Sequence, residues 1–337
     1  MTRTPGRGPV TIFAVVCVAA VAFVAWSLMR ARQEASSPAA TRPGPSDAAA
    51  SVTLPAPPAP PFVLVRQLAS GSGWSRLALA PLDAPDGPRF ITPLTCVRAY
   101  VAGGRGLCLA SNGADGRAIV FDATTFVPEH TLVLTGPPSR ARVSRDGRLG
   151  AVTVFESGHS YAEEGFSTRT TVLDLETGTP FPELESFAIW QDEARLRRID
   201  INLWGVTFIP GTRRFYATLA YGGTPYLAEG DLDRREVRVL APHVECPSLS
   251  PDGTRLAFKR ADGLRWRLWV RQVASGAEHI IAGETRSIDD QVEWLDDTHV
   301  LYQFPSDEGN NLYAVHTDDG TPARRFMREA WSPAVVR

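Results

Sequence analysis

Lysine is almost absent from this sequence. Lys259 is the only one, so arginine supplies nearly all of the 35 basic residues, which stand against 37 acidic residues. The two signs of charge are mixed along the chain and there is no basic excess, which excludes the electrostatic pattern of a nucleic-acid-binding protein. We interpret the preference for arginine as a bias of GC-rich coding rather than as a binding device.

The sequence also lacks the short motifs of common catalytic and metal sites. The six histidines are scattered without HxH or HExxH spacing, so we predict no histidine-based metal site and no cofactor. Two serine segments, "GSGWS" and "SGHSY", lack the last glycine of a G-x-S-x-G nucleophile elbow. The pairs Asp289–Asp290 and Asp296–Asp297 are more typical of solvated turns than of acid–base dyads. His159, in a long polar loop, is interpreted as a loop residue rather than as an acid or base.

One long uncharged run is present, "PVTIFAVVCVAAVAFVAWSLM" at residues 9–29. Its length suits a membrane-spanning helix of about 20 residues. We predict a signal anchor that leaves residues 1–8 in the cytoplasm and places the rest of this single-pass chain outside it. A cleaved signal peptide is the alternative, which the length of the run and the poor cleavage context "SLMRARQE" disfavour. Residues 30–61, rich in Ala, Pro and Ser, are predicted to form a disordered tether.

From Phe62 onward, short alternating apolar runs separated by Pro and Gly predict β-strands rather than helices. In "ECPSLSPDGTRLAFKR" (residues 245–260) the "SPDG" suits a type I turn between two strands. Similar units recur about every 45 residues, each followed by two shorter strands, as in the blades of a propeller. Five whole units are present: 96–136, 139–184, 202–241, 244–283 and 290–328. The remnants at 62–92 and 332–336 complement one another, so we predict an all-β ring of six blades over residues 62–337, closed by its last strand.

The segment "CPSLSPDGTRLAFKR" resembles the repeat of TolB-type propellers, also called WD40-like or PD40 repeats. The ordered set "SRARVSRDG", "WGVTF", "ATLAYGGTPYLAEGDL" and "TRSIDDQVEWL" more closely resembles actinobacterial proteins labelled TolB-like translocation proteins. This resemblance spans about residues 96–336 and implies a propeller fold. The label is itself an analogy, and fold does not imply function.

Two of the four cysteines, Cys96 and Cys108, fall on the first two strands of one predicted blade. The centre of their hairpin is about equidistant from both, so they can face one another, and an oxidising compartment favours a disulfide between them. Two buried free thiols are the alternative. Cys246 has no partner of this kind and is predicted to pack in the core.

Charged and polar residues open the innermost strands of successive predicted blades. They are candidate ligand-binding residues at one mouth of the central channel, a place where propellers commonly bind ligands. The candidates are Arg98, Arg142, Asn202, Trp204, Glu245, Asp290 and Gln291. The alternative is that the arginines and carboxylates merely pair across the channel and satisfy one another.

We therefore predict a membrane-tethered, extracytoplasmic binding scaffold without catalytic activity. Its partner is expected to be a protein, a peptide or another envelope ligand, and its membrane contact is residues 9–29. The alternative is a propeller enzyme of lyase or hydrolase type with its site at the channel mouth. The lack of a recognisable nucleophile–base pair or metal set favours the scaffold.

Overall fold

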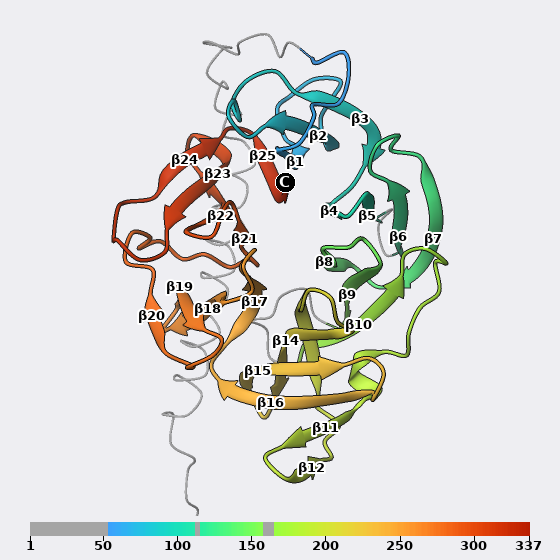
Figure 1. The fold of residues 1–337 in the computed structure, drawn as a ribbon, viewed down its shortest axis with the longest axis vertical. Helices are drawn as coiled ribbons and strands as arrows, with labels where there is room; N and C mark the ends of the chain where they lie inside the picture. Colours follow the sequence, from blue (N-terminus) through green and yellow to red (C-terminus); the bar gives the residue numbers. More distant parts are fainter. Residues whose placement is uncertain (1–52, 112–114, 158–164) are drawn as a thin grey trace, which may run out of the picture. The chain divides into compact units, whose positions relative to one another are not determined.

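The computed structural model describes residues 53–111, 115–157 and 165–337. Six sheets, antiparallel except for one strand pair in blade four, are arranged as blades around a ring (Figure 1). Blade one comprises β25 (Ala330–Val336), β1 (Phe62–Gln67), β2 (Arg76–Pro81) and β3 (Phe90–Thr95). Blade two comprises β4 (Arg98–Ala102), β5 (Arg105–Ser111), β6 (Asp115–Asp122) and β7 (Pro128–Thr135). Blade three comprises β8 (Pro138–Val143), β9 (Leu149–Ser157) and β10 (Ser167–Asp174). Blade five comprises β17 (Glu245–Leu249), β18 (Arg255–Asp262), β19 (Arg265–Gln272) and β20 (Glu278–Ile280). The sixth comprises β21 (Glu293–Trp294), β22 (His299–Ser306), β23 (Gly309–His316) and β24 (Arg324–Met327).

Blade four is larger than the repeat predicts. Its sheet contains β13 (Asn202–Phe208), β14 (Arg214–Tyr221), β15 (Thr224–Asp231) and β16 (Glu236–Pro242). A further hairpin, β11 (Ala188–Gln191) and β12 (Ala194–Leu196), extends the outer edge because β11 pairs in parallel with β16. Blade three correspondingly has three strands, which corrects the prediction of four. Pro180 and Pro182 lie where its outer strand is expected, and each lacks the N–H that a strand donates.

The ring closes through its last strand, as predicted. β25 pairs antiparallel with β1 in a register that places Phe62 opposite Val336 and Gln67 opposite Ala330. The remaining strands of that blade, β2 and β3, follow in order from β1, so the last strand of the chain is the innermost strand of the first blade. This pairing covers the exposed edge that β1 would otherwise present.

Apolar side chains fill the space between neighbouring blades. Leu107 and Leu109 of β5 pack with Val152 and Val154 of β9, and all four are at most 3% exposed. These residues alternate along their strands, and two of their neighbours along the chain, Cys108 and Ala151, belong to other clusters, so each strand buries both faces. The core is therefore divided into clusters between the blades, and polar residues are left to line the axis.

The turns of the repeat form as their sequences predict. In blade five Gly253 donates its N–H to the Ser250 carbonyl at 2.9 Å, and the Ser250 hydroxyl accepts from the N–H of Arg255. In the "SRDG" turn of blade three the N–H of Gly147 likewise donates to the Ser144 carbonyl at 2.8 Å, and the Ser144 hydroxyl accepts from the N–H of Leu149. Ser144 and Ser250 thus fix both turns, and the residue between serine and aspartate is free to differ.

The predicted disulfide joins Cys96, just before β4, to Cys108 on β5, with the Cα atoms 5.5 Å apart. Both residues are almost fully buried, and Cys246 is a buried free thiol as predicted. In the part of the chain that the structure describes, no helix is long and apolar enough to span a membrane. The predicted anchor at residues 9–29 and His159 lie outside the described residues.

Candidate functional site

Asp290 is the centre of one charged cluster on the axis of the ring. Its carboxylate lies 3.1 Å from Arg98 of blade two and 3.5 Å from Arg140 of blade three, and it also accepts a hydrogen bond from Gln303. Burial works to raise the pKa of Asp290, but Arg98 and Arg140 outweigh it and hold that pKa below its usual value. This carboxylate therefore stays charged and links three blades.

A second axial cluster is formed around Glu293 on β21. Arg142 donates to it at 2.6 Å and the Tyr100 hydroxyl donates at 2.9 Å, while the Arg142 guanidinium lies 4.5 Å from the centre of the Tyr100 ring. Burial and the negative charge of Glu293 raise the pKa of Tyr100 to about 12. Tyr100 is consequently a hydrogen-bond donor throughout the physiological range.

Gln291 joins two inner strands at their bulges. The registers of β13 and β17 shift between Trp204 and Thr207 and between Glu245 and Ser248. A bulge leaves local carbonyl groups outside the ladder. The Gln291 Nε2 lies 3.2 Å from the carbonyl oxygens of Gly205 and Val206 and 2.7 Å from that of Pro247. Its side chain is therefore committed to holding blades four and five together.

The axial charges are thus paired across the ring, which is the alternative that the sequence left open for them. Arg98 meets another candidate, Asp290, but Arg142 binds Glu293 rather than either candidate carboxylate, Asp290 or Glu245. Sequence reasoning missed four members of the two clusters, namely Tyr100, Arg140, Glu293 and Gln303. Three of these lie two residues from a predicted candidate, so the period-two alternation of a strand contained the signal.

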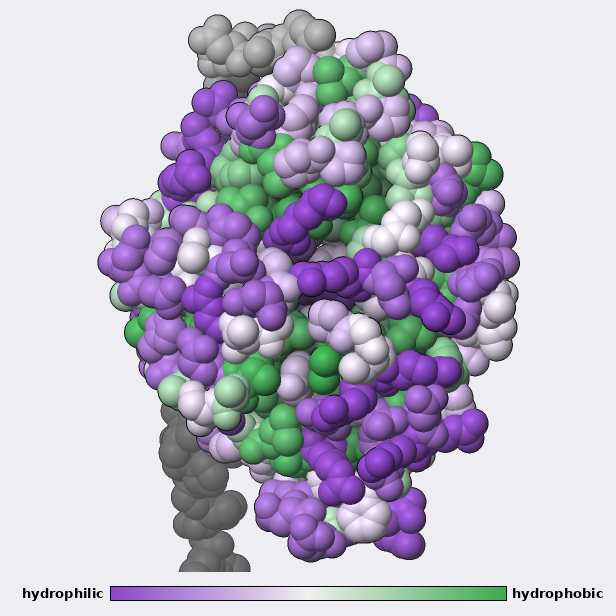
Figure 2. Space-filling view, viewed as in Figure 1, coloured by the Kyte–Doolittle hydropathy of each residue, from purple (hydrophilic) through white to green (hydrophobic). Residues whose placement is uncertain are grey.

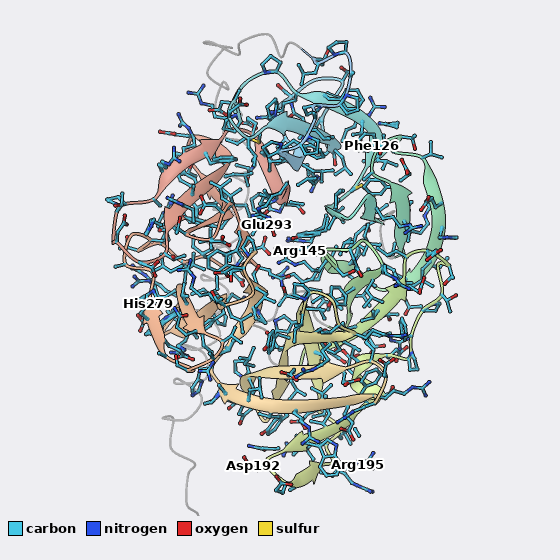
Figure 3. All side chains as sticks on the ribbon, viewed as in Figure 1. Phe126, Arg145, Asp192, Arg195, His279 and Glu293 are labelled. Carbon is cyan, nitrogen blue, oxygen red and sulfur yellow. A yellow bond between two sulfur atoms is a disulfide. The ribbon has the colours of Figure 1, made fainter. Side chains whose placement is uncertain are left out.

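The innermost strands all run in one direction, so the ring has a start mouth, where β4, β13 and β17 begin, and an end mouth, where they finish. A funnel of about 420 Å³ opens at the end mouth, above Arg142 and Glu293. Arg145 and Arg337 reach across it to the backbone carbonyls of Pro251 and Trp294. Figure 3 places Arg145 and Glu293 near the centre of the ring, and Figure 2 shows hydrophilic side chains gathered there.

A larger hollow, of about 600 Å³, lies at the start mouth between blades four and five, and we call it the start-mouth cavity. Three predicted candidates line it: Asn202 and Trp204 from β13 and Glu245 from β17. Trp204 is 2% exposed and meets the Phe166 ring edge-on at 5.5 Å. Asn202 Oδ1 accepts the N–H of Thr168 at 2.8 Å, which fixes its orientation.

The outer wall of the start-mouth cavity comes from two hairpins. The β14–β15 hairpin contributes Tyr221, whose ring stacks on Tyr226 at 4.7 Å, and the β18–β19 hairpin contributes Trp266. Aromatic walls with a few fixed polar groups are the usual composition of a ligand site. The sequence did not predict these outer residues, because they lie far from the inner strands along the chain.

Glu245 is the buried acid of the start-mouth cavity and is 4% exposed. Its carboxylate lies 3.7 Å from the ammonium group of Lys259, which also binds Asp289. Burial raises the pKa of Glu245 to about 7, even though Lys259 and Arg140 attract its negative charge. The ammonium group of Lys259, the single lysine of the chain, is fully buried and lies between these two carboxylates.

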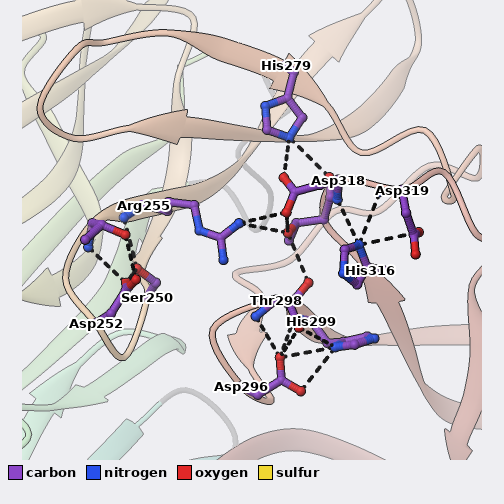
Figure 4. Close-up of polar contacts among 12 residues, drawn as sticks. Ser250, Asp252, Arg255, His279, Asp296, Thr298, His299, His316, Asp318 and Asp319 are labelled. Carbon is purple, nitrogen blue, oxygen red and sulfur yellow. Dashed lines mark hydrogen bonds and ion pairs between the residues drawn. The ribbon is translucent and has the colours of Figure 1, made fainter.

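A histidine–aspartate cluster occupies the seam between blades five and six (Figure 4). His279, His299 and His316 lie 3.1 to 3.4 Å from Asp318, Asp296 and Asp319 respectively. Each ring has its own carboxylate, and each of these aspartates is at least 44% exposed at its side chain. Within residues 53–111, 115–157 and 165–337 no group of His, Cys, Asp or Glu has the arrangement to hold a metal ion. The Asp296 carboxylate caps its own turn, as the sequence predicts, whereas the prediction of a solvated turn is wrong for Asp290, which is 5% exposed and paired on the axis.

No family model matches the chain, and no curated protein matches it in sequence. Its fold is that of known β-propellers. The crystal structure of TolB from Acinetobacter baumannii is similar with a TM-score of 0.60 and 16% identity, over 82% of this chain and 67% of that one. A chain of the nidogen/laminin complex is similar with a TM-score of 0.54 and 11% identity, over 81% of this chain and 97% of that one.

A Mycobacterium tuberculosis puromycin-hydrolyzing peptidase is a weaker match, with a TM-score of 0.45 and 12% identity, over 80% of this chain and 45% of that one. It is too distant to bear on function. The chain is therefore a six-bladed β-propeller, and TolB is among the proteins that share its fold. At these identities the likeness extends to the fold alone.

Proposed function

We propose that this protein is a membrane-tethered, extracytoplasmic propeller that binds a protein, a peptide or another envelope ligand without catalysing a reaction. The observation that carries this proposal is the start-mouth cavity. It combines a volume of about 600 Å³ with aromatic walls, an oriented amide and a buried carboxylate, Glu245. Cavities of this size and composition are typical ligand sites.

The axis of the ring supports a structural role for most of the other candidate residues. Arg98, Arg142, Asp290 and Gln291 have hydrogen-bonding partners on other blades, most of them across the channel, and these contacts hold the inner strands in place. If a ligand displaced one of these contacts, a buried charge or amide would lose its hydrogen-bonding partner. We therefore assign binding to the start-mouth cavity rather than to the axis.

The N-terminal sequence supports the tether. The uncharged run at residues 9–29 and the Pro-rich stretch after it fit an anchor followed by a spacer. We include in this proposal the resemblance of the sequence to actinobacterial proteins labelled TolB-like translocation proteins. The nidogen/laminin complex is a case in which a propeller of this fold takes part in a protein complex.

A crosslinking experiment on live cells tests the binding role. A photoreactive amino acid replaces Leu264, a fully exposed residue on the β18–β19 hairpin, and Val133, a 70% exposed residue on β7, in separate strains. We expect Leu264 to capture a specific partner that mass spectrometry identifies, and Trp266→Ala to reduce the yield. Equal capture from both positions, or none from Leu264, would contradict the proposed site.

Protease protection tests the topology. Protease added to intact spheroplasts is expected to remove the propeller, since the tether should place it outside the membrane. A cytoplasmic marker protein must stay intact as the control. Complete protection of the propeller in those spheroplasts would contradict the extracytoplasmic location.

A further inference from the structure

Two fully exposed apolar residues adjoin the lining of the start-mouth cavity along the chain. Ile199 precedes Asp200 of the lining and is 105% exposed, and Leu264, at the tip of the hairpin that presents Trp266, is 103% exposed. Scattered single apolar residues are normal on a surface, but each of these two lies within two residues of the lining of one cavity with aromatic walls. A small free molecule inside the cavity would leave both uncovered, whereas a protein surface would cover them.

The two carboxylates in the cavity lining differ in how closely they are paired. Asp200 lies 2.7 Å from Arg198. On the floor, the ammonium group of Lys259 lies 3.7 Å from Glu245 and binds Asp289 more closely. Burial outweighs the positive charges of Lys259 and Arg140 and raises the pKa of Glu245. A further cation at this carboxylate would stabilise its charged form.

The aromatic walls fit the same kind of group. Lys259 already places its ammonium group 4.2 Å from the centre of the Trp266 ring, so this pocket holds one cation against an aromatic face. Trp204 and Phe166 form a second, apolar wall. A long side chain with an aliphatic stem and a charged head packs its stem on such rings and directs its head to a carboxylate.

We propose that the start-mouth cavity receives an arginine or lysine side chain from a protein partner, with its stem against Trp204 and Trp266 and its charged head at Glu245. Ile199 and Leu264 then contact the partner's backbone and neighbouring apolar side chains. This inference rests on the proposed function, because it names the chemistry of the partner that the scaffold binds. It identifies a positively charged segment with flanking apolar residues as the element that is recognised.

The test is a titration of the purified full-length chain with two capped peptides. One is acetyl-Gly-Leu-Arg-Leu-Gly-amide, and in the other citrulline replaces arginine, which keeps the shape and removes the charge. Binding is followed by calorimetry up to about 10 mM peptide, which covers weak fragment affinities. We expect the arginine peptide to bind at least about tenfold tighter, the size expected for a charge-assisted hydrogen bond in a buried site.

Variants locate the effect. In Glu245→Gln the two peptides should bind equally, whereas Glu284→Gln, which changes a buried carboxylate paired with Arg286 outside the cavity, should keep the full difference. Trp266→Leu should weaken both peptides together, since it alters the wall and not the charge. Circular dichroism and melting curves establish that each variant is folded before its binding is interpreted.

The outcomes separate this inference from the proposed function. Equal binding of the two peptides to the wild-type chain, or no binding of the arginine peptide, overturns the inference. If the photoreactive residue at Leu264 nevertheless captures a partner, the scaffold proposal stands and its partner has another chemistry. If that position captures nothing either, both are wrong.

Discussion

Removing one member of the Arg142–Glu293 pair should destabilise the ring far more than removing both. The two side chains are less than 10% exposed and their charged atoms lie 2.6 Å apart. In Glu293→Leu, Arg142 keeps only neutral acceptors, the Ser248 hydroxyl and the Val292 carbonyl, each at 3.3 Å. Breaking a buried pair in this way costs about 3–5 kcal/mol, because one charge is left buried without compensation.

The size of the thermal shift follows from the size of the domain. The unfolding entropy of a domain as large as residues 53–337 is about 0.6 kcal/mol/K at the melting temperature. A loss of about 3–5 kcal/mol therefore lowers Tm by about 5–8 °C. The double variant Arg142→Leu/Glu293→Leu should recover most of this loss, because neither charge remains on the axis.

The assay is thermal and urea unfolding, followed by circular dichroism and tryptophan fluorescence, for the two single variants and the double variant. Arg325 and Glu308 serve as the matched control, since they form a pair of similar length, 2.7 Å, with side chains 34% and 69% exposed. Breaking that pair should cost less than about 1 kcal/mol. If the coupling energy of Arg142 and Glu293 is no larger than that of the control, water screens the axial pair and the reasoning is wrong.

Three further predictions concern other parts of the fold. Replacing Cys96 and Cys108 together by alanine should cost about 3 kcal/mol by the chain-entropy model, and a non-reduced digest of exported wild-type protein should contain the linked peptides; freely alkylated thiols there would contradict the pairing. Deleting residues 330–337 removes β25 and should abolish cooperative unfolding, so an unchanged melting transition would count against ring closure. The folded chain keeps a proton on Glu245 up to about pH 7, whereas the unfolded chain loses it near 4.5. The free energy of unfolding should therefore fall by up to about 3 kcal/mol as pH rises across this window. Glu245→Gln should remove this part of the pH dependence, and an identical pH profile for variant and wild type would refute it.

The ring itself was open to prediction from the sequence because the repeat is local. Each "SPDG"-like turn joins two neighbouring strands, and the terminal remnants complement one another, so strand pairing needs little information from distant residues. Blade four was different. In its added hairpin, β11 pairs in parallel with β16, in a register that joins Ala188 to Glu236, and no periodic pattern connects the two strands. Prolines at 180 and 182 were the available signal that blade three would lose its outer strand.

The candidate site was predictable only in part, for a geometric reason. The first residues of the inner strands were found because the repeat aligns them, and Asn202, Trp204 and Glu245 do line one cavity. Tyr221 and Trp266 belong to hairpin tips, whose position depends on how adjacent blades are tilted, and the repeat does not encode that tilt. Lys259 was visible as the only lysine of the chain, yet its burial is accompanied by two carboxylates from elsewhere in the sequence, Glu245 on β17 and Asp289 in the segment before β21.

The distribution of charge explains why a binding site would lie beside the axis rather than on it. On the axis, Asp290 meets Arg98 and Arg140, and Glu293 meets Arg142, so the carboxylates of blade six are compensated across the ring from blades two and three. A ligand entering the axis would have to break these ion pairs, and the contacts that it formed with the charged groups would only replace those lost. At the start-mouth cavity, by contrast, Glu245 lies 3.7 Å from Lys259, which binds Asp289 more closely, so an incoming cation can bind Glu245 without breaking a short ion pair. Aromatic walls line the same mouth, so a partner can bind there while the axial network keeps the ring closed.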